Sequence, residues 1–445
     1  MSENGQQIRS CTLRLSRMEP SGTSRAAAGV YHGWLVVGAA FLVALFGWGL
    51  GFYGPGIYLV ALQNRHGWST AAISSAITTY YLLGATLVFF AGIIFERFGV
   101  RRVVSTGAVA MAGGVVLLSL VSDPWQIYAA FAVMSLGWAA MSGAAINIIV
   151  APWFDKRRGL AVSLALNGAS TGGVVIAPLL ILLIGRFDLP VALTCAAGVM
   201  LVILLPTVAL VLRSKRTGER DPADDNPPSA QPQLSESALT VERQTWQLST
   251  VLCNGNFQTI SIPFALGLTT QVGFLTHQVA YLSPIVGTIA AGWAVSLTTF
   301  SAVAGRIVTG FLVDKVDRRV AACGNFCVQI VGIGLLASNA SAAALYLGCI
   351  LFGLGVGNMI SLPGLIVQQE FPKQHFSRIV SLIVAINQFT FAFGPGLLGY
   401  LRRTEGSYTT ALVVCLVVQV MAAIIVVSPV LGRIVRQSSG KEVRH

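Results

Sequence analysis

The sequence predicts an all-α membrane protein of twelve transmembrane helices, arranged as two six-helix pseudo-symmetric halves. Three observations predict this fold: the composition, the length of the apolar blocks and an internal repeat. Hydrophobic residues make up 54% of the 445 residues and charged residues only 10%, whereas a soluble domain is about 25% charged. The apolar residues gather in blocks of about 20 or more, which is enough to cross about 30 Å of hydrocarbon.

Each apolar block is expected to be a helix, because an isolated strand could not satisfy its backbone in lipid. A membrane β-barrel would instead show shorter segments of alternating polarity. The one long polar interval, 213–250, has no apolar periodicity and predicts a flexible linker. The twelve blocks are 34–60, 70–95, 103–121, 125–150, 160–184, 189–212, 251–278, 286–312, 319–338, 343–368, 379–400 and 408–431.

The linker divides the twelve blocks six and six. The predicted organisation is a disordered tail (1–30), an N-terminal half (31–212), the linker (213–250), a C-terminal half (251–432) and a second tail (433–445). The first tail is polar and basic and lacks a short apolar core with a cleavage site. We therefore expect no cleaved signal peptide, and Met18 is an alternative start.

The basic residues lie in short clusters between the apolar blocks. The formal net charge is +12, which raises the question of nucleic acid, but the clusters form no continuous basic face. Most of the 29 Lys and Arg residues fall on one side of the membrane. The positive-inside rule then places both termini in the cytoplasm, and the expected location is the cytoplasmic (inner) membrane.

The two halves repeat each other. The segment Gly92–Arg102 follows the second block, and Gly310–Arg319 follows the eighth at an offset of 218 residues. A second echo at nearly the same offset aligns Phe154 with Phe371 and Pro178 with Pro395. A parallel repeat of two six-helix halves is a known plan for transporters, with the substrate site between the halves near mid-membrane.

The segment after the second block also resembles the loop motif of the major facilitator superfamily, Gly-x-x-x-Asp-Arg-x-Gly-Arg-Arg. The resemblance implies a twelve-helix transporter, and we expect the loop to act as a gate that closes the cytoplasmic side. A carboxylate and a guanidinium at helix ends can pair across the halves; alternatively, the arginines only set the topology. The expected gating residues are Gly92, Glu96 (in place of Asp), Arg97, Gly99, Arg101, and, from the second half, Asp314 and Lys315.

A second motif narrows the resemblance to one branch of the superfamily. The segment Trp153–Gly172 is similar to the signature of monocarboxylate porters and of the oxalate/formate exchangers. Three departures stand against a full match. The first block has no Lys, Ala302 stands where animal porters have an acid, and Asn387 stands where oxalate-type exchangers have a second cation. One cation instead of two favours a monoanion over a dicarboxylate.

Arg306 is the one Lys, Arg, Asp or Glu expected well inside an apolar block. An Arg at a helix centre costs about 2.5–3.5 kcal/mol on insertion scales, so it must face protein or water. Its planar guanidinium can bind a carboxylate through two parallel hydrogen bonds. The resemblance implies this role, because related families carry a substrate-binding Arg eight residues before the position of Asp314. The alternative is that Arg306 braces a helix or extends to the membrane surface.

Four further residues are predicted to contact the substrate: His277, Tyr53, Asn358 and Asn387. His277 is also the remaining titratable candidate, and an imidazole suits proton coupling or ligand contact. The alternative for each is a structural hydrogen bond between helices. The predicted cargo is a small organic anion, most simply a monocarboxylate, moved by alternating access with proton coupling or by exchange.

Other functions are weighed against this one. No catalytic constellation, metal site, phosphate-binding loop or cofactor motif is recognisable, so no enzyme activity, cofactor or metal is expected. The seven cysteines predict no disulfide framework. No obligate protein partner and no nucleic acid are expected, only the lipid bilayer and the solute. The alternatives are efflux of an amphiphilic or neutral solute, and a receptor or scaffold that kept the fold without transport.

Overall fold

The computed structural model describes residues 31–154, 157–213, 248–313, 315–338, 341–372 and 375–442. The predicted first tail, nearly all of the predicted linker and Asp314 lie outside these residues. Twelve helices in the described part are long and apolar enough to cross a membrane. They correspond one to one to the twelve predicted blocks, so the predicted fold class is confirmed, and the chain is an integral membrane protein.

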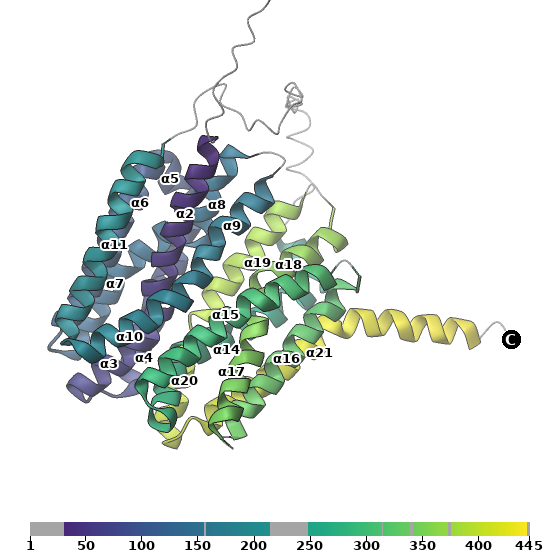
Figure 1. Ribbon diagram of the computed structural model, residues 1–445. Helices are drawn as coiled ribbons and strands as arrows, with labels where there is room; N and C mark the ends of the chain where they lie inside the picture. Colours follow the sequence, from purple (N-terminus) through teal and green to yellow (C-terminus); the bar gives the residue numbers. More distant parts are fainter. Residues whose placement is uncertain are drawn as a thin grey trace, which may run out of the picture.

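The two halves lie side by side, one coloured purple to teal and the other green to yellow (Figure 1). The elements of the N-terminal half are α2 (His32–Trp48), η2 (Gly49–Tyr53), α3 (Gly54–His66), α4 (Thr70–Phe89), α5 (Ala91–Phe98), α6 (Val100–Leu120), α7 (Pro124–Met141), α8 (Gly143–Val150), η3 (Ala151–Trp153), α9 (Arg158–Thr171), η4 (Gly172–Ile176), α10 (Ala177–Arg186) and α11 (Leu189–Val211). Those of the C-terminal half are α13 (Leu248–Leu252), α14 (Gly255–Val286), α15 (Thr288–Leu312), α16 (Arg318–Ser338), α17 (Ala342–Val356), α18 (Asn358–Glu370), α19 (Phe376–Phe391), α20 (Gly394–Glu405) and α21 (Thr409–Glu442).

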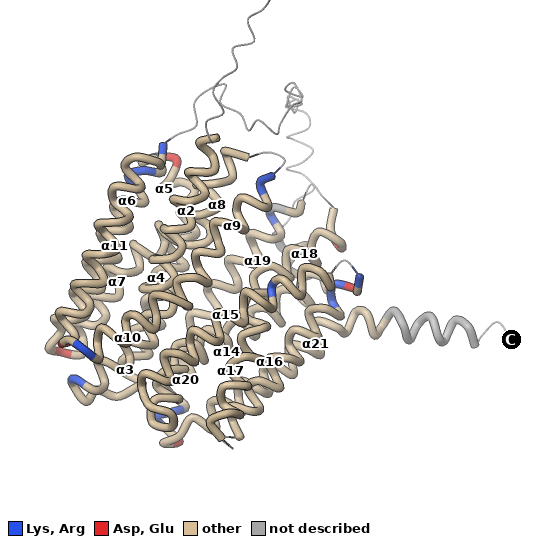
Figure 2. Tube along the Cα trace, viewed as in Figure 1, with Lys and Arg blue, Asp and Glu red and all other residues tan. Residues whose placement is uncertain are grey.

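Most of the charged residues gather at the two ends of this bundle, and the helix surfaces between them are apolar (Figure 2). Large apolar side chains face outward, such as Phe89, Val202 and Leu210. This is the arrangement that lipid selects, because the surrounding solvent is itself hydrocarbon. We call the end where α2 begins and α11 ends the linker end, and the opposite end the distal end.

Within each half, glycines bring helix backbones into contact. A Cβ atom on Gly168 of α9 would overlap the carbonyl oxygen of Phe41 in α2, and one on Gly305 of α15 would overlap that of Leu354 in α17. Without a hydrophobic force between helices in lipid, such close packing is a main source of helix association. Each half is therefore fixed by backbone contacts that tolerate no larger side chain.

The C-terminal half also contains a buried network of amides. Gln419 of α21 donates to Thr270 of α14 (2.9 Å) and to Gln329 of α16 (2.8 Å), and Gln329 donates to Gln271 of α14 (3.4 Å). All three glutamines are at most 2% exposed. Three helices that share one set of hydrogen bonds move together, so this network supports motion of the half as one body.

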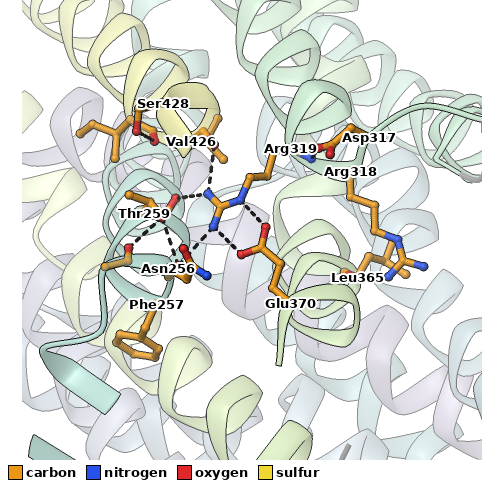
Figure 3. A network of polar contacts seen from close by, with 12 residues as sticks. Asn256, Phe257, Thr259, Asp317, Arg318, Arg319, Leu365, Glu370, Val426 and Ser428 are labelled. Atoms are coloured by element: carbon orange, nitrogen blue, oxygen red, sulfur yellow. Dashed lines mark hydrogen bonds and ion pairs between the residues drawn. The ribbon is translucent and has the colours of Figure 1, made fainter. Parts of the chain in front are cut away.

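At the linker end of the same half, Arg319 is almost completely buried (1% exposed) and paired with Glu370. Its Nε and Nη2 atoms donate to the two carboxylate oxygens at 2.5 and 2.7 Å. The guanidinium also donates to the carbonyls of Thr259, Val426 and Asn256 (Figure 3). One side chain thereby joins α14, α16, α18 and α21.

Glu370→Ala is expected to lower the free energy of unfolding by about 3–5 kcal/mol, because it leaves the Arg319 guanidinium buried without its carboxylate. Thermal and denaturant unfolding of the purified chain measure this change. Glu405→Ala is the matched control, since the Glu405 side chain is exposed and its loss should change stability by less than about 0.5 kcal/mol. Equal stability of the two variants would contradict a role for the buried pair.

Candidate functional site

Arg306 lies on α15, six residues before the helix ends at Leu312. It is partly buried, and no residue in the described part of the chain forms a hydrogen bond or ion pair with its guanidinium. Its guanidinium packs close to the junction of α17 and α18, because a Cβ atom on Gly357 would lie only 3.2 Å from its Nε atom. A charged fork of donors is thus held inside the membrane region with donor capacity to spare.

Tyr53, from the opposite half, is the predicted site residue that the structure brings close to Arg306. The two groups are near enough to interact electrostatically. The Tyr53 ring rests on Gly173 of η4, where a Cβ atom would lie 2.7 Å from the ring. The methyl group of Thr299, two turns before Arg306 on α15, touches the same point. Tyr53 therefore sits where the first, fifth and eighth membrane spans meet.

Two π-helical segments line this meeting point, and neither was predicted. One is η2, which ends at Tyr53, and the other is η4, which contains Gly173. They pack on each other: a Cβ atom on Gly49 of η2 would lie 2.7 Å from the Cβ of Ile176 in η4. Short π-helical segments inside α-helices occur frequently at functional sites. The glycines around them are the sequence signal that could have pointed here.

Asn358 follows Gly357, but its side chain is 2% exposed and faces the interior of the C-terminal half. Its amide donates to Thr309 of α15 (2.8 Å) and to Asn325 of α16 (2.9 Å). Asn387 is 5% exposed on α19, and its Oδ1 atom makes no hydrogen bond within the described residues. For both residues, contact with a substrate stays a prediction.

His277 is not among the residues that surround Arg306. It lies in the interface between the two halves, where it is 1% exposed. Its Nε2 atom is 3.2 Å from the Ser74 hydroxyl of α4 and 3.0 Å from the Pro395 carbonyl of α20. Its Nδ1 atom is 3.0 Å from the Tyr408 hydroxyl. The ring thus bridges the two halves.

The halves are bonded together on the distal side of the site. Besides the Ser74 contact, the backbone N–H of Gly396 donates to Thr78 (2.9 Å), and Ser296 donates to the carbonyl of Val174 in η4 (3.2 Å). All three of these contacts lie between the site and the distal end. This structure is therefore closed at the distal end.

Three of the predicted gating residues, Glu96, Arg97 and Arg101, lie at the linker end of the N-terminal half. Glu96, Arg97 and Arg101 are exposed and take part in no ion pair of the described residues, although Arg97 stacks on Phe98 at 5.5 Å. A Cβ atom on Gly92 would meet no atom within 4 Å, so Gly92 makes no close helix contact here.

The remaining gating positions are Gly99, Lys315 and Asp314. Gly99 has a φ of 79°, a conformation that favours glycine. Lys315 lies in the turn after α15, next to Asp314, which is outside the described residues. Gating by all these residues stays a prediction.

Residues at corresponding positions of the internal repeat make different contacts in the two halves. Arg319 corresponds to Arg101 at the offset of 218, yet Arg319 is buried and paired whereas Arg101 is exposed. Trp153 stands at the repeat position of Glu370, and its ring packs beneath the Arg213 guanidinium at 5.3 Å. No three His, Cys, Asp or Glu side chains of the described residues gather closely enough to hold a metal ion.

Comparison with known proteins places this geometry in a wider context. The sequence matches the Major Facilitator Superfamily over residues 39–395, with a second match over 287–443. It is 26% identical over 371 residues to MFS-type transporter 1 of Ophiocordyceps sp. (strain BCC 1869), covering 81% of this chain and 77% of that protein. It is 27% identical over 402 residues to human Monocarboxylate transporter 11, covering 85% of this chain and 79% of that protein.

Among solved structures, the crystal structure of the nucleoside transporter NupG superposes with a TM-score of 0.65. The superposition covers 90% of this chain and 99% of that one at 12% sequence identity. At this identity the likeness concerns the fold alone: it extends over nearly the whole of both chains.

Gly56→Ala is expected to weaken closure of the distal end, because its Cβ atom would lie 2.6 Å from the carbonyl oxygen of Thr276 in the other half. Cysteine-accessibility labelling on the distal side should rise several-fold. Gly38→Ala on α2 is the matched control, since no atom lies within 4 Å of that position. Unchanged labelling of both variants would contradict the tight contact.

Proposed function

This chain belongs to the major facilitator superfamily and is a membrane transporter, and we propose that it carries a small organic anion by alternating access. A monocarboxylate is the simplest cargo, taken up or released together with protons or in exchange for another anion. The single observation that carries the proposal is Arg306, a guanidinium inside the membrane region that bonds to no described residue.

The chemistry of Arg306 supports an anionic ligand. A buried charge costs free energy unless it is paired, and the usual partner of a guanidinium is a carboxylate bound through two parallel hydrogen bonds. Tyr53 would add a hydroxyl from the other half. A ligand held by Arg306 and Tyr53 touches both halves at once, as alternating access requires of a central site.

The number of cations sets the proposed valence of the cargo. The described helix interiors offer Arg306 as a free cation, while the fully buried Arg319 is already neutralised by Glu370. Asn387, where a second cation stands in oxalate-type exchangers, is neutral. A single charge suits a monoanion, and the relatives named as monocarboxylate transporters agree with this.

The proposed cycle alternates between two closures. The present arrangement closes the distal end through the contacts of Ser74, Thr78 and Ser296. In the other arrangement these contacts break and the linker end closes instead, with Glu96 and Arg97 of one half and Asp314 and Lys315 of the other forming the pairs that hold it. In this proposal the protein lies in the inner membrane and its linker end faces the cytoplasm, as the positions of the basic clusters favour.

A second candidate cargo is an amphiphilic solute. A groove of about 340 Å³ lies on the C-terminal half where α15 meets Val174 of η4, and it is lined by Val174, Trp293, Ser296, Leu297, Phe300 and Tyr346. Trp293 and Phe300 are exposed there, so an apolar group could rest against them. If Trp293→Ala removed transport of apolar solutes while Arg306→Ala did not, efflux of an amphiphile would be the better account.

Arg306→Ala is expected to reduce uptake of a radiolabelled monocarboxylate into proteoliposomes at least about tenfold, since a charge-assisted hydrogen bond is worth about 1.5–3 kcal/mol. Arg306→Lys should retain part of the activity because it keeps the charge but loses the fork. Arg186→Ala is the control, as this Arg is exposed at the distal end. If Arg306→Ala transports with normal affinity, Arg306 is a brace, and if no monocarboxylate moves or competes in the wild type, the cargo is wrong.

Tyr53→Phe is expected to raise the KM about threefold to tenfold with little change in kcat, because a neutral hydrogen bond contributes about 0.5–1.5 kcal/mol. Tyr58→Phe is the comparison, since the Tyr58 hydroxyl donates to the carbonyl of Leu50 in its own span (3.2 Å). The same kinetic change in both variants would mean that Tyr53 acts through packing alone.

A further inference from the structure

His277 is a titratable side chain buried where the two halves meet. Its partners come from three separate places: Ser74 on α4, Pro395 at the start of α20, and Tyr408 just before α21. Ser74 belongs to the N-terminal half, whereas Pro395 and Tyr408 belong to the same half as His277. Separation of the halves at the distal end therefore removes Ser74 and leaves the other two partners in place.

The hydrogen bonds fix which nitrogen of the neutral ring carries the proton. The Pro395 carbonyl can only accept, so Nε2 must carry a proton and donate it, with the Ser74 hydroxyl close enough (3.2 Å) to share it. The Nδ1 atom of a neutral imidazole is then an acceptor, and the Tyr408 hydroxyl donates to it across 3.0 Å. A neutral ring satisfies all three contacts, so the closed arrangement gains no hydrogen bond from a second proton.

The charges around the ring also oppose a second proton. Neither α4 nor α14 contains a Lys, Arg, Asp or Glu residue, and the Arg402 guanidinium lies 5.4 Å from the centre of the Tyr408 ring. No ion pair of the described residues reaches His277. Charged or titratable groups also lie at the ends of these elements: Tyr281, 5.7 Å from Tyr408 between ring centres, Arg65 and His66 on α3, and Arg403 and Glu405 on α20. Within the elements, the titratable groups include Tyr58 on α3, Tyr80 and Tyr81 on α4, Tyr400 on α20 and Cys415 on α21.

We propose that His277 is a proton-binding site that controls the distal closure, so that the distal end closes only when the ring is neutral. The inference rests on the proposed alternating access. Opening the distal end removes Ser74 and admits water, and an imidazole in water titrates near pH 6.5. A proton from the water then binds the Nδ1 lone pair, and the Tyr408 hydroxyl turns its own proton away.

Closing the distal end reverses these steps. The Nδ1 proton returns to water, Tyr408 donates to Nδ1 again, and Ser74 meets Nε2. An imidazolium left in the contact would be a buried charge that no carboxylate of the described residues pairs with, which is unfavourable. Acid on the distal side consequently holds that side open and exposes the central site to it, so the pH of that compartment determines which way the transporter faces.

The test measures the distance across the distal end without any substrate. Spin labels replace Asn64 and Thr404, which are exposed at that end on opposite halves, in the full chain with its native cysteines substituted. Between pH 7.5 and 5.5 the wild type should move from a short to a long distance. One proton allows at most about a tenfold change in the ratio of the two populations per pH unit.

His277→Gln should stay at the short distance at both pH values, because a neutral amide can still donate to Pro395 and accept from Tyr408. His66→Gln, at the other histidine of the distal end, should keep the response of the wild type. Ser74→Ala should increase the long-distance population at both pH values and keep the pH response. A wild type without a pH response, an unaltered response in His277→Gln, or no shift in Ser74→Ala would each overturn the proposal.

The outcome is separable from that of the proposed cargo. A distal end that opens in acid through His277, in a chain that moves no monocarboxylate, would preserve this inference and reject the cargo. A chain that moves monocarboxylates through Arg306, but whose distal distance ignores pH, would do the reverse.

Discussion

A charged side chain inside a membrane must reach an opposite charge, a hydrogen-bond acceptor or water, and this chain meets that constraint in two opposite ways. Arg319 is saturated by Glu370 and three backbone carbonyls, and so ties four helices into one body. Arg306 bonds to no described residue and lies where the halves meet. Arg319 holds the helices of the C-terminal half together, so that this half can move as a unit. Arg306 is the proposed binding site for the ligand that this movement transports.

The site and the closure are joined by the same helices. Tyr53 ends η2, η2 packs on η4, and the carbonyl of Val174 in η4 accepts a hydrogen bond from Ser296 of α15. Thr299 and Arg306 follow on α15. A ligand that draws Arg306 toward Tyr53 therefore acts on a seam that contains one hydrogen bond between the halves, and His277 takes part in another. A ligand at Arg306 and a proton at His277 would therefore both shift the equilibrium between the open and closed distal end.

Sequence reasoning succeeded where one residue or one block decides the outcome. The twelve spans follow from hydropathy, because lipid permits only helices there, and Arg306 is conspicuous because a charge in an apolar block is costly. Sequence reasoning could not identify contacts between residues that are far apart in the chain. Glu370 lies 51 residues from Arg319, and His277 lies 203 from Ser74. The π-helical segments were missed because a shift in backbone bonding leaves little trace in residue pattern beyond nearby glycines.

The central claim is that a negative charge on the cargo binds at Arg306. The most direct measurement compares a monocarboxylic acid with its own amide, which has nearly the same shape but no charge, by calorimetric titration of the purified chain. The account predicts that the carboxylate binds and the amide binds at least about tenfold more weakly, as the loss of a charge-assisted hydrogen bond requires. Equal affinity for the two compounds would contradict it.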